Sequence, residues 1–388
     1  SIFLLTFGSY NQGIPLFFEI ILNKSDKISR IVLQQNVSIN SITLFHSAIK
    51  SAKTKTLYDS SLKQFLQHYQ ITNPNELIEI EVKNLQKMLE AYVLYLRERG
   101  LSLASIKTFY CSLNLFLSMN DIIINWVKIR KMFPEQTKPR GQKPYTTEQI
   151  NQILKLFSNS PKYTAITHFL SASGVREGFS EELKIKHLSD MPLGCKAVKV
   201  YADHIKEYTT FIHQEAVKSL DEYFEFRKKN GEKLTPDSWV FSSASDPNKP
   251  LTTQNIVTQF SHKCKDKIDR GEFKNNRYDI SITYGIRKRW DTIVKSNPEV
   301  NRDIIEKIFG HSSRIPLDNG YFKPITEVMF EEYKKVIPEL VLDSSYKLKY
   351  ELEAKDKKIN DLLAKQNEVS VLKSQMSEIQ EHIKNLKA

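Results

Sequence analysis

Four residues in the second half of the sequence form an ordered set that is suited to chemistry on a phosphate. Arg176 follows the small residues Ser-Ala-Ser-Gly-Val, and Arg287 ends the motif Tyr-Gly-Ile-Arg about 110 residues later. His311 lies in Phe-Gly-His-Ser-Ser, and Tyr321 stands ten residues beyond it. Guanidinium groups bind phosphate through paired hydrogen bonds, imidazole donates or accepts a proton, and a phenol can act as a nucleophile. The ordered set is far more specific than any of its members and indicates phosphoryl transfer.

Composition favours an anionic partner and disfavours metal chemistry. Lys and Arg total 57 against 45 Asp and Glu, which gives a formal charge of +12 and a pI near 9.2. Such a balance favours a polyanion without identifying it. The three cysteines, Cys111, Cys195 and Cys264, contain no C-x-x-C pair, and no set of convergent carboxylates stands out. We therefore expect no cofactor, no bound metal and no disulfide framework.

The early sequence carries no targeting signal that we recognise. Its most apolar stretch, residues 14–22, is short, includes Glu19 and lacks a small-residue cleavage site. It therefore fits neither a signal peptide nor a membrane-spanning helix. We expect a soluble, cytoplasmic protein that has no membrane partner.

The distribution of apolar residues predicts a mainly α-helical protein with a small β-sheet. Residues 1–45 lack a clear period and form an N-terminal extension of unclear role, whereas 46–137 show helical spacing throughout and predict an all-helical domain. Residues 138–145 are rich in Pro, Gly and charge and predict a linker. Residues 146–342 combine helices with a β-rich stretch and predict an α+β domain. Residues 343–388 predict a coiled-coil helix.

The coiled-coil prediction rests on a seam that recurs every three or four positions from Leu348 to Leu386, apolar except where Lys355 and Gln366 fill two of its positions. Val369 and Leu372 are three residues apart where four is due, so the pairing should be weak or adaptable. A helix that packs back on its own protein remains the alternative.

The order Arg, Tyr-x-x-Arg, Gly-His-Ser and Tyr resembles the active-site series of tyrosine recombinases, the phage integrase family. The resemblance covers roughly residues 50 to 342 and implies that the helical domain is a core-binding domain and the α+β domain is catalytic. The Lys-, Asn- and Ile-rich composition and the Tyr-x-x-Arg variant further resemble integrases of archaeal viruses and plasmids. The family implies a site-specific recombinase that cleaves and rejoins DNA through a 3′-phosphotyrosine.

The resemblance also assigns roles to single residues. It implies that Tyr321 attacks the phosphorus, that Arg176 and Arg287 clamp the phosphate, and that His311 hydrogen-bonds a phosphate oxygen. A lysine would protonate the departing 5′ oxygen. Lys206 is our choice because it precedes an apparent returning strand, and Lys199 remains the alternative.

One catalytic position departs from the family's usual series of Arg, Lys, His-x-x-Arg, His or Trp, and Tyr. A second, lesser departure lies outside that series. Tyr284 stands where the first His is expected, and a phenol whose pKa is about 10 is a poor general base at neutral pH. Phe179 stands where a carboxylate is often found, and Glu177, Glu181 or Glu182 are candidates to replace it. The first departure predicts a slow enzyme rather than an inactive one.

The expected partners are double-stranded DNA and three further copies of the chain, joined into a tetramer on DNA by the C-terminal helices. The candidate phosphate contacts, each as well explained by a solvated surface, are Lys53, Lys55, Lys138, Arg140 and Lys143. Two other functions remain open: relaxation of supercoils, as by a type IB topoisomerase, and DNA binding by a relative that has lost catalysis.

Overall fold

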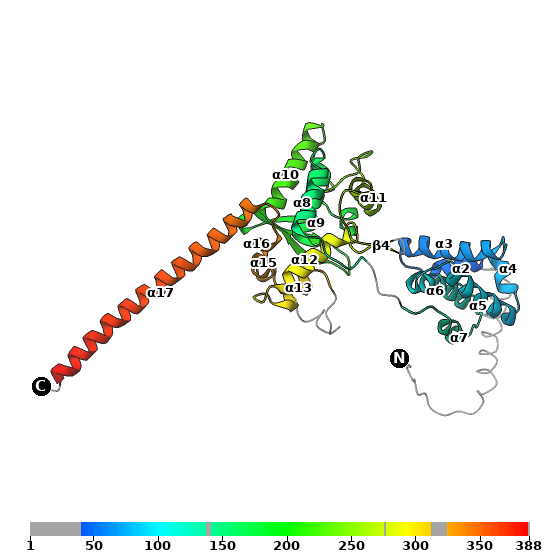
Figure 1. The fold of residues 1–388 in the computed structure, drawn as a ribbon, viewed down its shortest axis with the longest axis horizontal. Helices are drawn as coiled ribbons and strands as arrows, with labels where there is room; N and C mark the ends of the chain where they lie inside the picture. The colour runs from blue at the N-terminus through cyan, green and yellow to red at the C-terminus, as the bar shows by residue number, and fades with distance from the viewer. Residues whose placement is uncertain (1–39, 137–140, 275–276, 312–323, 387–388) are drawn as a thin grey trace, which may run out of the picture. The chain divides into compact units, whose positions relative to one another are not determined.

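The computed structural model describes residues 40–136, 141–274, 277–311 and 324–386, and these form two compact units that divide between Lys138 and Pro139 (Figure 1). The predicted nucleophile Tyr321 and the candidate DNA contacts Lys138 and Arg140 lie outside the described residues, as do residues 1–39.

The described residues of the first unit are all helical where they have regular structure, and aromatic side chains fill their core. The helices are α2 (Ser41–Ser47), α3 (Ala52–His68), α4 (Pro74–Glu79), α5 (Val82–Glu98), α6 (Leu103–Met119) and α7 (Trp126–Lys131). Asn73 caps α4 in a reciprocal pair of hydrogen bonds with Glu76. Phe45 is fully buried and meets the ring of Phe116 edge-on at 5.7 Å. Helix α2 therefore packs on this unit, although the sequence placed most of it in the N-terminal extension.

The second unit surrounds a three-stranded antiparallel sheet with helices. The strands are β1 (Leu188–Met191), β2 (Cys195–Val200) and β3 (Tyr208–Ile212), in that order, with Val198 opposite Thr210. The helices along this part of the chain are α8 (Thr147–Leu156), α9 (Pro161–Ser173), α10 (Gln214–Lys229), α11 (Thr253–Cys264), α12 (Tyr284–Ser296), α13 (Arg302–Ile308), α15 (Thr326–Lys334), α16 (Ile337–Leu340) and α17 (Ser344–Leu386). Two further short strands, β4 (Phe273–Lys274) and β5 (Arg277–Tyr278), pair antiparallel. The prediction of a mainly α-helical protein with a small sheet is confirmed.

Buried aromatic rings join the helices that carry the predicted site. Trp290 of α12 stacks on Phe309 at 4.9 Å and donates from its indole nitrogen to the carbonyl of Ala172 in α9 at 2.9 Å. The next residue after α9, Gly174, has φ of +59°, and a Cβ there would lie 2.7 Å from the Trp290 ring. Only glycine fits this turn, which leads directly to Arg176.

The C-terminal segment is anchored by buried polar groups. Glu215 accepts hydrogen bonds from the backbone N–H groups of Leu342 and Asp343, each at 2.9 Å. Tyr350, in the second turn of α17, is buried in the same unit, whereas the apolar residues beyond it are exposed. These are Leu352, Ile359, Leu362, Val369, Leu372, Met376 and Ile379. Helix α17 is continuous for 43 residues, but a partner helix for it is not part of the structure, so the coiled coil stays a prediction.

This anchor should make the second unit sensitive to acid. His168 and His213 lie 4.0 Å from the Glu215 carboxylate, and burial lowers their pKa values to about 4 and about 3. Because the unfolded chain binds protons near pH 6.5, stability is full above that pH and falls as the pH drops towards 4. The lowered pKa of His168 alone corresponds to a loss on the order of 3 kcal/mol in the free energy of unfolding as the pH falls from 6.5 to 4. The raised pKa of Glu215, which follows from burial, acts in the opposite direction.

Urea unfolding at several pH values between 7 and 4 checks this prediction. His213→Leu should flatten the dependence, whereas His262→Asn, at an exposed position of α11, should leave it as in the parent. If the free energy of unfolding changes equally with pH in all three proteins, the buried histidines do not cause the acid sensitivity.

Candidate active site

A groove of about 1180 Å³ in the second unit brings together three of the predicted site residues. Arg176 enters it from the segment after α9, Lys206 from the turn between β2 and β3, and His311 from the segment after α13. Three parts of the chain that are well separated in sequence therefore present a guanidinium, an ammonium and an imidazole to one space. This combination suits an anion.

The backbone of Gly310 holds Arg176 in the groove. The guanidinium donates to the Gly310 carbonyl at 2.6 Å and lies 5.9 Å from the centre of the Tyr208 ring. Gly310 has φ of +67°, and a Cβ there would come within 2.7 Å of that ring. The glycine that the motif Gly-His-Ser supplies is thus required sterically as well as for its backbone conformation.

Arg287 is only 4% exposed, and its guanidinium is fixed by backbone carbonyls. It donates to the carbonyl oxygens of Gly174 and, at 2.9 Å, Phe309, and its central carbon lies 3.5 Å from the centre of the Phe309 ring. Burial lowers the pKa of Arg287; Tyr208 opposes this shift, and the nearby charge of Arg176 adds to it. A guanidinium nevertheless stays ionised at neutral pH, so an anion in the groove would relieve the repulsion between the two arginines.

A chain of ionic contacts orients His311. Its Nδ1 lies 2.5 Å from a carboxylate oxygen of Glu306, whose other oxygen accepts from Lys295 at 2.6 Å. Burial alone would raise the pKa of Glu306, but the hydrogen bonds from Lys295 and His311 lower it, so the residue is a carboxylate. With Nδ1 directed at Glu306, Nε2 is the ring atom that can face a phosphate.

The lysines considered as proton donors differ in where the structure places them. Lys206 lines the groove, and its backbone N–H donates to Nδ1 of His204 at 3.1 Å. Lys199 points its ammonium to Glu207 at 3.7 Å, and Lys196 forms an ion pair with Asp190. Neither of these two is among the described residues that line the groove.

Comparison with solved structures decides the fold. The described fold is similar to the Tn1549 transposon integrase in two complexes with circular intermediate DNA, each with a TM-score of 0.53 and 15% identity, covering 78% and 76% of this chain and 100% and 98% of the other. A third complex, with transposon right end DNA, gives a TM-score of 0.50 at 15% identity and covers 76% and 99%. The chain has the tyrosine recombinase fold. Neither a family model nor a curated protein sequence matches it.

Within this recombinase fold, Tyr284 is placed differently from Arg176, Lys206 and His311. It begins α12, its side chain is 41% exposed, and its ring lies 5.2 Å from the ammonium of Lys288. It lines a hollow of about 520 Å³ with Arg270 and Arg277, and it is not among the described residues that line the groove.

Phe179 is a core residue. It is buried and stacks on Phe169 with the ring centres 5.0 Å apart. Of the carboxylates considered in its place, Glu177 accepts a hydrogen bond from the hydroxyl of Thr283, Glu181 accepts from the backbone N–H of Thr253 at 2.9 Å, and Glu182 lines the groove. Glu177 thus links the segment of Arg176 to the start of α12.

The candidate DNA contacts that the structure describes are exposed or paired. Lys53 and Lys55 lie on the exposed side of α3 in the first unit. Lys143 forms an ion pair with Asp279 at 2.8 Å in the second unit. Across the described parts of the chain we find no cluster of three or more His, Cys, Asp or Glu residues that could hold a metal, and no helix whose length and apolar content would let it span a membrane.

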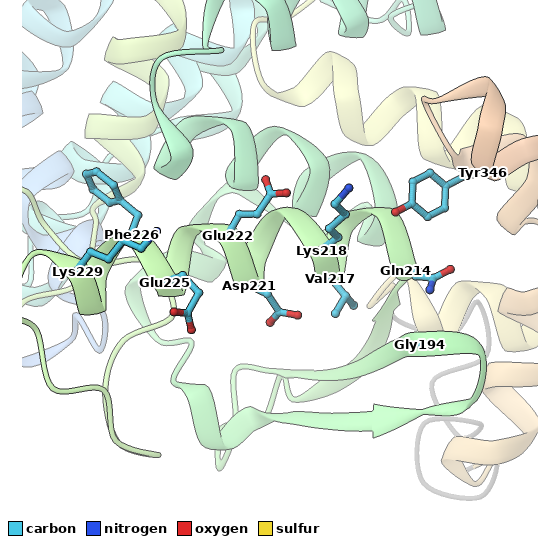
Figure 2. A pocket seen from close by; sticks show the side chains of 10 residues that line it. All are labelled: Gly194, Gln214, Val217, Lys218, Asp221, Glu222, Glu225, Phe226, Lys229 and Tyr346. Carbon is cyan, nitrogen blue, oxygen red and sulfur yellow. The ribbon is translucent and has the colours of Figure 1, made fainter.

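A further hollow of about 770 Å³ follows α10 (Figure 2). Asp221, Glu222 and Glu225 of α10 line it, and Tyr346 of α17 lies near its end at Gln214. Lys218 and Lys229 line it as well, so its charges are mixed, and none of the described residues lines both this hollow and the groove.

Two residues at or beside the groove were not predicted from the sequence. Glu306 was not considered, although it contacts His311, and Tyr208 was used only to locate a strand. No sequence signal marks either one, because an acidic residue in a short helix and a tyrosine at the start of a strand are both ordinary.

Proposed function

We propose that the protein is a site-specific DNA recombinase that cleaves and rejoins DNA strands through a covalent 3′-phosphotyrosine at Tyr321. The observation that carries the proposal is the meeting of Arg176, Lys206 and His311 in one groove of a recombinase fold, with Arg287 fixed by the residue that precedes Gly310. Double-stranded DNA, the partner in the related complexes, is the proposed substrate.

Cleavage in this proposal is an in-line displacement at phosphorus. The Tyr321 oxygen forms a bond to phosphorus, and the bond to the 5′ oxygen breaks. Arg176 and Arg287 stabilise the charge on the non-bridging oxygens, His311 donates to one of them, and Lys206 gives a proton to the leaving 5′ oxygen. The reverse attack by the 5′-hydroxyl of another strand restores the phosphodiester without ATP.

A circular DNA that carries two target sites tests the proposed function. The protein, incubated with this DNA and a chelator, should change the connectivity of the two segments. Topoisomers without recombinant products would favour the type IB topoisomerase alternative. Tight binding without either product would favour a DNA-binding relative that has lost catalysis.

Tyr284 offers a test of the first departure from the family pattern. A phenol at this position accepts a proton poorly, so the proton of Tyr321 must go to His311, water or the phosphate. Tyr284→His should raise the single-turnover cleavage rate by about tenfold. Cleavage no faster than in the parent, with DNA affinity unchanged, would show that this position does not limit the reaction.

The exposed apolar stripe of α17 supports assembly into a tetramer on DNA. Leu352, Ile359 and Leu362 are more than half exposed, whereas Tyr350 is part of the buried core. Deleting residues 351–388 keeps the core contacts and removes the stripe, so sedimentation should show a lower oligomeric state while binding to a single DNA site persists. Unchanged sedimentation of the shortened protein would rule out this role for α17.

A further inference from the structure

Tyr208 forms part of the wall of the groove, and the proposed mechanism does not use its hydroxyl. The Tyr208 ring leaves no room for a side chain at position 310, and its centre lies 5.9 Å from the central carbon of the Arg176 guanidinium. The hydroxyl is buried and, within the described residues, has no hydrogen-bond partner. Since an unsatisfied buried hydroxyl costs free energy, its presence calls for a reason.

A second unsatisfied group lies at the same place. The Nε of Arg287 is also buried and, in the part of the chain that the structure describes, lacks a hydrogen-bond partner. The charges of Arg287 and Arg176 near the Tyr208 oxygen lower the pKa of the phenol, but burial is the larger effect and raises it. An uncharged phenol oxygen accepts hydrogen bonds from guanidinium N–H groups.

We propose that Tyr208 is a positioning residue for Arg287: its hydroxyl oxygen accepts a hydrogen bond from the Nε–H of Arg287 when a DNA phosphate occupies the groove. The inference rests on the proposed function. Hydrogen bonds at an active site are often long in the free enzyme and shorten when the substrate binds, which agrees with two nearby groups that are not yet bonded.

The donors of Arg287 show what this contact would achieve. A guanidinium has five N–H donors, and the Gly174 and Phe309 carbonyls each take one. With Nε–H held by Tyr208, two N–H groups remain, one on each terminal nitrogen. That pair can bind two phosphate oxygens, and the guanidinium plane is fixed before the chemistry begins.

Tyr208→Phe tests the proposal because it removes the hydroxyl and keeps the ring against Gly310. Single-turnover cleavage of a suicide DNA substrate should slow by about tenfold to a hundredfold, with the Kd for DNA unchanged. The matched control is Tyr333→Phe, which removes another buried hydroxyl, one that donates to the Ala172 carbonyl at 2.9 Å. The control should lose stability and keep the cleavage rate per folded molecule.

A spectroscopic readout separates this proposal from the proposed function. In the 15N NMR spectrum of the protein bound to DNA, the Nε–H signal that disappears in Arg287→Lys should move and exchange faster with solvent in Tyr208→Phe, without any need for cleavage. An unmoved signal, or parent-like cleavage by Tyr208→Phe, overturns the positioning role. If the parent protein cleaves no DNA, the proposed function fails and the NMR signal alone decides whether Tyr208 holds Arg287.

Discussion

Tyr321→Phe should eliminate the SDS-stable adduct that the parent protein forms with a nicked or 5′-bridging-phosphorothioate DNA in chelator. The phenol oxygen is the atom that would bond to phosphorus, and phenylalanine has no nucleophile to replace it. The expected loss of adduct is complete within detection, whereas DNA affinity should change little because one hydroxyl is removed from a large contact area. Gel electrophoresis of labelled DNA in SDS measures the yield of the adduct.

Another phenol at the site provides the control. Tyr201 and Tyr208 both line the groove that holds Arg176, Lys206 and His311, but the Tyr208 hydroxyl is buried, so Tyr201 is the alternative nucleophile to test. Tyr201→Phe should retain the adduct. An adduct that survives Tyr321→Phe and vanishes in Tyr201→Phe would reverse the assignment, and a parent protein that binds DNA but forms no adduct would favour a relative without catalysis.

The position of a groove residue could be predicted from the sequence where its motif also determines the backbone conformation. The glycine before His311 is required by the Tyr208 ring, and its carbonyl accepts from Arg176, so the motif predicts the residue and its position together. The position of Tyr284 was not predictable, because spacing identifies the residue that begins α12 but not the direction of its side chain.

Buried polar partners were beyond the reach of sequence patterns. Apolar spacing predicted the helical character of both units, since it reports which residues face the core. It does not report that His213 lies 4.0 Å from the Glu215 carboxylate, or that a short helix such as α2 buries Phe45 against Phe116. These contacts join residues that are distant in sequence and of ordinary type, so only the folded chain reveals them.

Two buried arginines of helix α12 allow an effect on the reaction to be separated from an effect on stability. Arg287 and Arg289 are 4% and 3% exposed, and both donate to backbone carbonyls. Arg289 donates to the carbonyls of Leu340 and Glu339 in α16, and neither residue is among the described residues that line the groove. Lysine in either place loses the planar set of donors and leaves buried carbonyls unsatisfied, so each variant should be destabilised by about 2 kcal/mol.

Only Arg287→Lys should also impair the reaction. A lysine cannot bind the carbonyls and two phosphate oxygens together, so single-turnover cleavage per folded molecule should fall by a factor of about 100 to 1000. Arg289→Lys should cleave at the parental rate once the folded fraction is measured by urea unfolding. Equal losses of rate in both variants would mean that Arg287 acts through the stability of α12. A loss confined to Arg287→Lys would mean that the buried guanidinium acts on the phosphate itself.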